Sequence, residues 1–209
     1  MDFMPVDVPQ GITGMEEGNF TRRYEIVKST AEGLGSISVS TSKPAWRVIT
    51  DYLAGFNGPL SEKTKQSQFR QRTASEIIAS RRLNGCTERA LAFLALSREM
   101  RVPALYVETF EKAWLERESG DEFNGHIFVD LKIDGEWKPY ETKRGFPKDG
   151  RYFREDTEYV EVGKGIDFSA VYVRQPDGTY SQQPVAIDGF PKLRELEKDF
   201  RARAHQGRF

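Results

Sequence analysis

The 209-residue chain is poor in the residues that form disulfides and bind metal ions. It has one cysteine, Cys86, and two histidines, His126 and His205. A single cysteine excludes an internal disulfide, and so few thiols and imidazoles leave little material for a zinc site. We therefore expect a reducing compartment, no bound metal and no cofactor.

Two further absences narrow the classes of protein that the chain can belong to. Lys and Arg number 31 against 32 for Asp and Glu, a net charge of −1, so no overall positive field attracts nucleic acid or an anionic membrane. No stretch approaches the ~18 uninterrupted apolar residues of a membrane span, and the start, MDFMPVDVPQ, lacks the pattern of a secretory signal. These features predict no nucleic-acid partner, no membrane partner and a cytoplasmic location.

The N-terminal quarter has weak patterning until a helix begins. Residues 1–22 indicate an irregular arm, and the stretches 23–30 and 36–42 favour short strands on either side of a glycine turn. Residues 42–56 then change to a helical period, in which one face carries Trp46, Ile49, Tyr52 and Leu53. We expect that face to pack on the core.

The middle of the chain predicts two helices after a polar loop at 57–72. Thr73 followed three residues later by Glu76 is a capping box, which marks the start of the first helix. The second helix covers 86–100 and is uninterruptedly apolar from Ala90 to Leu96, as expected of a helix that is buried on nearly every side.

Beyond this helix the pattern becomes the two-residue alternation of strands. It covers 104–110 and a hairpin over 126–142, whose Asp134–Gly135 pair is a two-residue turn signal of the type I′ kind. Further strands are expected at 158–163, 168–174 and 179–186. Helices followed by antiparallel strands predict an α+β fold.

We divide the chain into three parts of one domain. Residues 1–56 form an N-terminal extension whose helix packs on the core, and residues 57–190 form the core with its C-terminal strands. Residues 191–209 form a charged surface helix and a tail. This division matches the size of a single domain with additions.

Cys86 follows the Asn84–Gly85 break, in the first turn of the buried helix. Unpaired backbone N–H groups at a helix start favour a thiolate. The helix dipole contributes at most about 2 kcal/mol, or roughly 1.5 pK units, so from a reference near 8.5 it brings the thiol only close to neutrality. The thiol therefore needs a partner base.

His126 is the candidate base, because it opens the first strand of the hairpin. If Asp134–Gly135 form the two-residue turn, Glu141 lies opposite Phe128 and is a diagonal neighbour of His126 on the same face. Side chains in these positions can meet. A three-residue loop would turn Glu141 to the opposite face.

A second acid, Asp130, shares the face but lies four residues along the strand from His126, some 13 Å away at ~3.3 Å per residue. Distance therefore favours Glu141 as the carboxylate that orients the imidazole. The alternative is that Cys86 and His126 are separate core residues. The joint occurrence of helix start, strand start and matched acid favours an assembled triad, while His205 is expected to be solvated in a charged tail.

Two stretches, NGCTERALAFLALSREMRVPALYV and GHIFVDLKIDGEWKPYET, resemble the transglutaminase-like superfamily of papain-fold enzymes. The likeness covers roughly residues 73–142. It implies an α+β core in which a Cys-bearing helix packs on an antiparallel sheet. It also implies Cys86 as nucleophile, His126 as general base and acid, and Glu141, where the family usually has Asp, as the orienting group.

The resemblance implies acyl transfer on peptide or protein amides, glutamine included, through a thioester. It leaves hydrolysis and transfer to an amine both open. The oxyanion would be bound by the Cys86 N–H and a second donor, for which the upstream candidates are Gln66, Gln68, Gln71 and Trp46. The alternative is a catalytically inactive interaction module, and the segment 111–125 is either a lid or a surface excursion. The sequence does not fix the oligomeric state.

Overall fold

The structure is a computed structural model that describes residues 9, 11–12, 14, 17–22, 24–117, 123–147 and 150–207. The fold is α+β, as the sequence predicts. Its helices are α1 (Glu25–Thr41), α2 (Ala45–Ala54), α3 (Glu62–Ser67), α4 (Ala74–Ser80), α5 (Cys86–Glu99), α6 (Lys112–Glu116) and α7 (Phe190–His205). Its strands are β1 (Ala104–Glu111), β2 (Gly125–Ile133), β3 (Glu136–Tyr140), β4 (Phe153–Arg154), β5 (Thr157–Gly165) and β6 (Val171–Val173).

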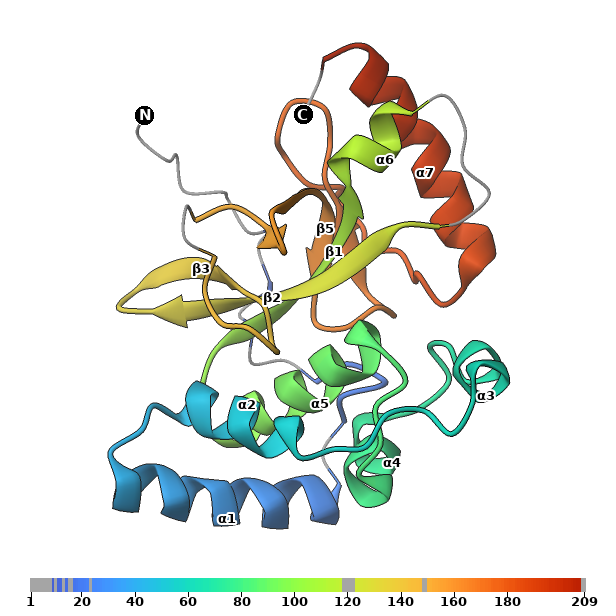
Figure 1. Cartoon of the computed structure of the whole chain (residues 1–209). Helices are drawn as coiled ribbons and strands as arrows, with labels where there is room; N and C mark the ends of the chain where they lie inside the picture. Colours follow the sequence, from blue (N-terminus) through green and yellow to red (C-terminus); the bar gives the residue numbers. More distant parts are fainter. Residues whose placement is uncertain are drawn as a thin grey trace.

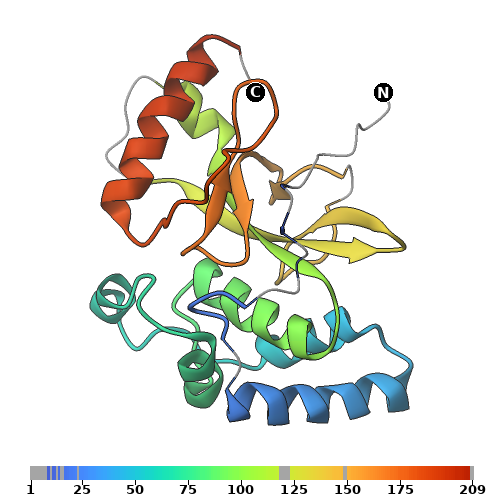
Figure 2. The same cartoon turned by 180° about the vertical axis from the view of Figure 1, so that it is seen from behind.

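The strands form one curled antiparallel sheet in the order β3-β2-β1-β5-β4, with β6 also paired to β5. Helices α1, α2, α4 and α5 gather on one side of the sheet, while α6 and α7 pack together at its other end (Figure 1). The view from behind shows the same separation (Figure 2). Among the described residues, no helix combines the length and the apolar character that crossing a membrane requires.

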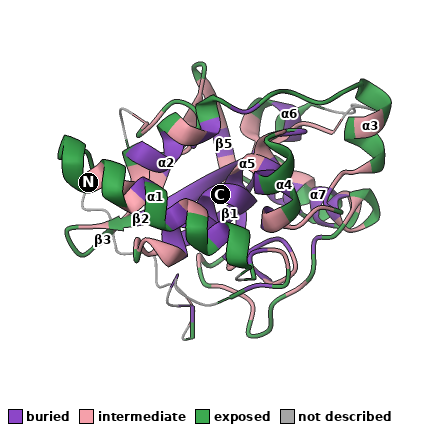
Figure 3. Cartoon of the chain, turned by 90° about the horizontal axis from the view of Figure 1, so that it is seen from below, coloured by how far each residue is buried: buried purple, intermediate pink, exposed green. Residues whose placement is uncertain are grey.

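Helix α5 lies at the centre of the molecule. Eleven of its side chains are buried, including the whole run from Ala90 to Leu96. It packs against β1 and β2 on one side and against α1, α2 and α4 on the other (Figure 3). The predicted burial on nearly every side is confirmed, and the buried apolar residues of α1, α2 and α7 belong to the same hydrophobic core.

The two N-terminal strands were a wrong prediction, because 23–30 and 36–42 lie largely in helix α1. The helix buries Val27, Ala31 and Leu34, spaced four and three residues apart. The β-branched Ile37 and Val39, which suggested a strand, are 47% and 84% exposed. The two side chains point to solvent, so their two-residue spacing does not mark the buried face of a strand.

The helices predicted at 42–56, after Thr73 and at 86–100 are present, and the structure corrects where they begin and end. Helix α2 begins at Ala45, after Pro44. The polar stretch 57–72, which was expected to be a loop, contains α3, capped by Ser61. The capping box between Thr73 and Glu76 is present at α4.

The hairpin has the predicted register. Ile133 pairs with Glu136 and Val129 with Tyr140, across a turn in which Asp134 has a φ of 54°. The strand predicted at 158–163 lies within β5, and β6 lies within 168–174, whereas 179–186 contributes two isolated bridges.

The C-terminal helix is less superficial than its charge suggests. Leu193, Leu196 and Phe200 of α7 are buried, and the Phe200 ring lies 5.8 Å from that of Phe110. The proposed lid at 111–125 contains α6, whose Trp114 is buried, while 118–122 lie outside the described residues.

A buried ion pair lies between the sheet and the loop before α4. Arg70 donates to both carboxylate oxygens of Glu108 at 2.8 and 2.7 Å, and both side chains are 1% exposed. Tyr106 donates to the same carboxylate at 2.7 Å, and Arg70 also binds the Ile187 carbonyl. The pair joins three distant parts of the chain.

We expect Glu108→Gln to lower the free energy of unfolding by about 3–5 kcal/mol, because it leaves the Arg70 charge buried without a counter-ion. The control is Glu62→Gln, which disrupts the exposed pair with Lys65 and should cost less than about 1 kcal/mol. Urea unfolding measures both. Equal losses in the two variants would contradict the prediction.

Candidate active site

Cys86 occupies the first position of α5 and is half-buried. The preceding Gly85 has φ 156° and ψ −167°, a conformation that glycine adopts without strain, and it has no side chain to cap the helix. Glu88 fixes the loop by accepting hydrogen bonds from the Asn84 N–H at 2.8 Å and from Arg72 at 3.0 Å. The first N–H groups of the helix therefore stay directed toward the space around the thiol.

An uncovered edge of β2 receives the cysteine. Strand β3 pairs with β2 only as far as Val129, and the chain turns away after Tyr140. The N–H of Ile127, which lies beyond the last paired residue, donates to the Cys86 sulfur. The early departure of β3 thus lets the start of α5 contact the start of β2.

The same departure brings Glu141 to His126. Glu141 Oε1 lies 3.3 Å from His126 Nε2, and each side chain is 5% exposed. Glu141 Oε2 accepts the backbone N–H of Lys143 at 3.2 Å, in a turn that the Glu141 N–H closes onto the Gly145 carbonyl at 2.9 Å. Since Nε2 faces Glu141, Nδ1 is the ring nitrogen left for the thiol.

The electrostatics of the site favour an ion pair between the thiol and the imidazole. Burial opposes charge on His126, but hydrogen bonds to Cys86 and Glu141 outweigh it and raise its pKa to about 9. Burial likewise raises the pKa of Cys86, yet the hydrogen bond and the charge of His126 bring it below the ordinary value. Glu141 has a lowered pKa, because its hydrogen bond with His126 outweighs burial.

The sequence did not point to Arg154 and Tyr159, which border this site. Arg154 Nη1 lies 3.4 Å from His126 Nδ1, and the Tyr159 ring lies 5.7 Å from that of His126. Burial raises the pKa of Tyr159, and the charge of Arg154, with a hydrogen bond from it, partly offsets this. Both residues come from the β4–β5 hairpin: Tyr159 lies on β5, two strands away from β2, and Arg154 on β4, three strands away.

Asp130, the acid that distance disfavoured, has other partners. It accepts Lys164 Nζ at 2.6 Å and the Tyr152 hydroxyl at 2.9 Å. Burial raises its pKa, and the Lys164 charge opposes that shift. Glu161 completes the cluster at 3.2 Å from Lys164, while His205 is exposed, as expected.

The proposed oxyanion donors differ in where they lie. The side-chain carbonyl of Gln68 accepts a hydrogen bond from the side-chain amide of Asn84 at 2.6 Å, beside the Cys86 loop. Gln66 is exposed, and the Gln71 amide donates to the Phe69 carbonyl at 3.5 Å. The Trp46 ring packs on Tyr140 at 5.5 Å. The second donor stays a prediction, with Gln68 as the candidate linked to the loop.

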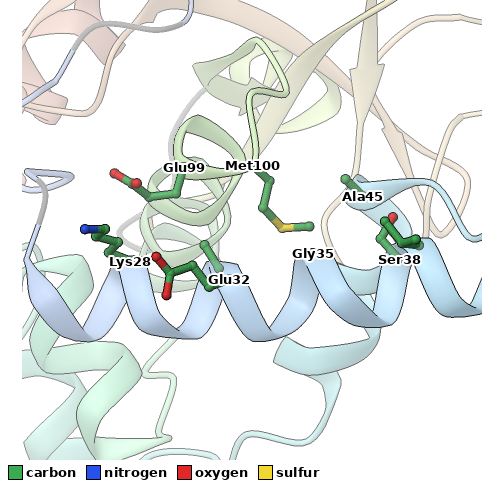
Figure 4. Close-up of a pocket in the computed structure, with 9 residues that line it drawn as sticks. Lys28, Glu32, Gly35, Ser38, Ala45, Glu99 and Met100 are labelled. Atoms are coloured by element: carbon green, nitrogen blue, oxygen red, sulfur yellow. The ribbon is translucent and has the colours of Figure 1, made fainter.

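One groove of the described chain lies away from Cys86. It has a volume of about 420 Å³ and lies between α1 and the C-terminal end of α5, where Glu32 and Glu99 face it with Met100 (Figure 4). At 1.5 Å of rise per residue, Met100 lies roughly 20 Å along the helix from Cys86. Within the described part of the chain, no three His, Cys, Asp or Glu side chains gather as metal ligands.

Comparison with known proteins finds no family model and no curated protein that matches the chain. A solved structure of a candidate cysteine protease from Cytophaga hutchinsonii is similar, with a TM-score of 0.49 at 18% identity, over 78% of this chain and 49% of that one. The chain thus spans about half the length of that protein. A likeness at this level does not bear on activity.

The geometry predicts how the reactivity of Cys86 depends on pH. The thiol should react with iodoacetamide at a pH below that of an ordinary cysteine, because His126 stabilises the thiolate. His126→Asn should move the midpoint of the rate upward, toward that of the unfolded protein. Mass spectrometry of the alkylated chain across pH measures both, and an unchanged midpoint would show that His126 does not activate the thiol.

Proposed function

We propose that the protein is a cysteine-dependent enzyme of the transglutaminase-like kind that transfers acyl groups from amide bonds of peptides or proteins. The observation that supports this proposal most directly is that His126 is hydrogen-bonded both to Cys86 and to Glu141, whose carboxylate lies 3.3 Å from the imidazole. A nucleophile, a base and an orienting group in contact are the arrangement that such chemistry needs. The cysteine lies at a helix start, where N–H groups suit a developing oxyanion.

In the first half-reaction the Cys86 thiolate attacks the amide carbonyl carbon, and the carbonyl electrons move to oxygen. The oxyanion accepts the N–H of Cys86 and of a second donor. As the tetrahedral intermediate collapses, the C–N bond breaks and the amine leaves with a proton from His126. A thioester on Cys86 remains, with a neutral imidazole.

In the second half-reaction His126 takes a proton from water or from a second amine, which attacks the thioester carbonyl. The C–S bond breaks, the acid or the new amide leaves, and the thiolate and imidazolium return. Glu141 keeps the ring oriented and stabilises its positive charge throughout. Hydrolysis and transfer share every group named, and the acceptor decides between them.

The test uses amidated peptides that contain glutamine, with and without an added primary amine. We expect hydrolysis products, amine adducts, or both, and an acyl-enzyme of matching mass on Cys86. Cys86→Ala should abolish all three, because no other thiol exists in the chain. A library of peptides and glutamine amides that yields neither product nor acyl-enzyme would favour the non-catalytic interaction module.

The role of Glu141 has its own prediction. We expect Glu141→Gln to lower kcat/KM by about 10²- to 10⁴-fold, because the amide cannot stabilise the imidazolium. Glu136→Gln, an exposed glutamate on the same hairpin, is the matched control and should leave kcat/KM unchanged. Peptide turnover measures both, and an active Glu141→Gln enzyme would remove the carboxylate from the mechanism.

A further inference from the structure

Arg154 competes with Cys86 for the Nδ1 nitrogen of His126. A guanidinium has donors and no acceptor, so its 3.4 Å contact with His126 Nδ1 requires an unprotonated nitrogen there. The ion-pair state places a proton on that same nitrogen, facing Cys86. The contact of Arg154 with Nδ1 and the reactive ion pair therefore exclude one another.

Among the described residues, Arg154 makes no ion pair. Within the described ranges, no Asp or Glu oxygen lies within ion-pair distance of its guanidinium, although the neighbouring Arg144 pairs with Glu155 and Arg151 with Glu158 at 3.3 Å. It also interacts with Tyr159, and its charge helps to lower the pKa of Glu141, which is bound to His126. Because the half-buried guanidinium makes no direct ion pair with a described carboxylate, it keeps donors that can bind a further anion.

The backbone of Arg154 belongs to a tight hairpin. It forms the last pair of β4 with Thr157 of β5, across a turn in which Glu155 and Asp156 have φ values of 51° and 64°. Such a two-residue hairpin turn fixes both strand ends. The guanidinium can therefore move between His126 and the space beside it while its Cα stays in place.

We propose that Arg154 is a specificity-determining residue that binds a carboxylate of the substrate next to the amide that Cys86 attacks. This rests on the proposed function and names its substrate class: peptides with an acidic side chain, or a free C-terminal carboxylate, at the reacting bond. Planar Arg–carboxylate pairing is strong and directional. Binding the carboxylate draws the guanidinium from Nδ1 and lets His126 accept the thiol proton.

The test compares two alkylating reagents of similar size, anionic iodoacetate and neutral iodoacetamide, on Cys86. We expect Arg154→Gln to lower the ratio of iodoacetate to iodoacetamide rates by about tenfold, because the charge-assisted hydrogen bond is lost. Arg154→Lys should retain part of the ratio. Arg151→Gln, which removes the same charge from an exposed place just before the same hairpin, should leave the ratio unchanged.

The ratio of the two alkylation rates tests the carboxylate site separately from the proposed cysteine enzyme. If iodoacetamide still reacts while the ratio is equal in the wild type and in Arg154→Gln, the carboxylate site is overturned and the cysteine enzyme stands. If Cys86 is inert to both reagents in the folded protein, both proposals fall. Thermal melting of each variant identifies any that does not fold, and Arg154→Lys then replaces Arg154→Gln.

Peptide substrates distinguish the two sources of carboxylate. One amidated peptide carries glutamate beside the scissile amide, a second has a free C-terminus there, and a third is amidated and neutral. We expect one or both acidic peptides to have higher kcat/KM than the neutral peptide, and Arg154→Gln to remove that preference. Faster turnover of the neutral peptide by the wild type would overturn the proposal.

Discussion

The packing of α5 against an edge of the sheet is the constraint on which the rest of the structure depends. Because α5 is buried on nearly every side, its start cannot shift without disturbing contacts with the sheet and with three other helices. That fixed start carries Cys86 to the part of β2 that β3 leaves unpaired. The loss of a few ladder hydrogen bonds thus creates the place where thiol, imidazole and carboxylate meet.

Buried charge surrounds this contact on both faces of the sheet. The Arg70–Glu108 pair lies on the α5 side, and the Asp130–Lys164–Glu161 cluster lies on the other. The negative charge of Glu108 raises the pKa of Cys86, against the effect of His126, so its pairing with Arg70 limits an unfavourable field. Buried ion pairs contribute little to stability by themselves, but they hold polar groups in one arrangement.

Local patterns carried most of what could be predicted. The α5 helix and the β2–β3 hairpin are continuous in sequence, so a capping signal, an apolar run and an Asp134–Gly135 turn specify them, and the register placed Glu141 near His126. The prediction failed at α1, where exposed β-branched residues imitate a strand. Arg154 was missed because its turn, Glu155–Asp156, lacks the glycine signal, and because its approach to His126 crosses strands distant in sequence.

The order of the elements along the chain also governs when Cys86 can meet His126 during biosynthesis. A chain that emerges from its N-terminus completes α5 before the β2 strand, and the β4–β5 hairpin follows later still. Until β2 pairs with β1, Cys86 has no imidazole neighbour and keeps the reactivity of an unactivated thiol. The incomplete chain therefore carries Cys86 as an ordinary thiol, and its contact with His126 forms only when the sheet closes.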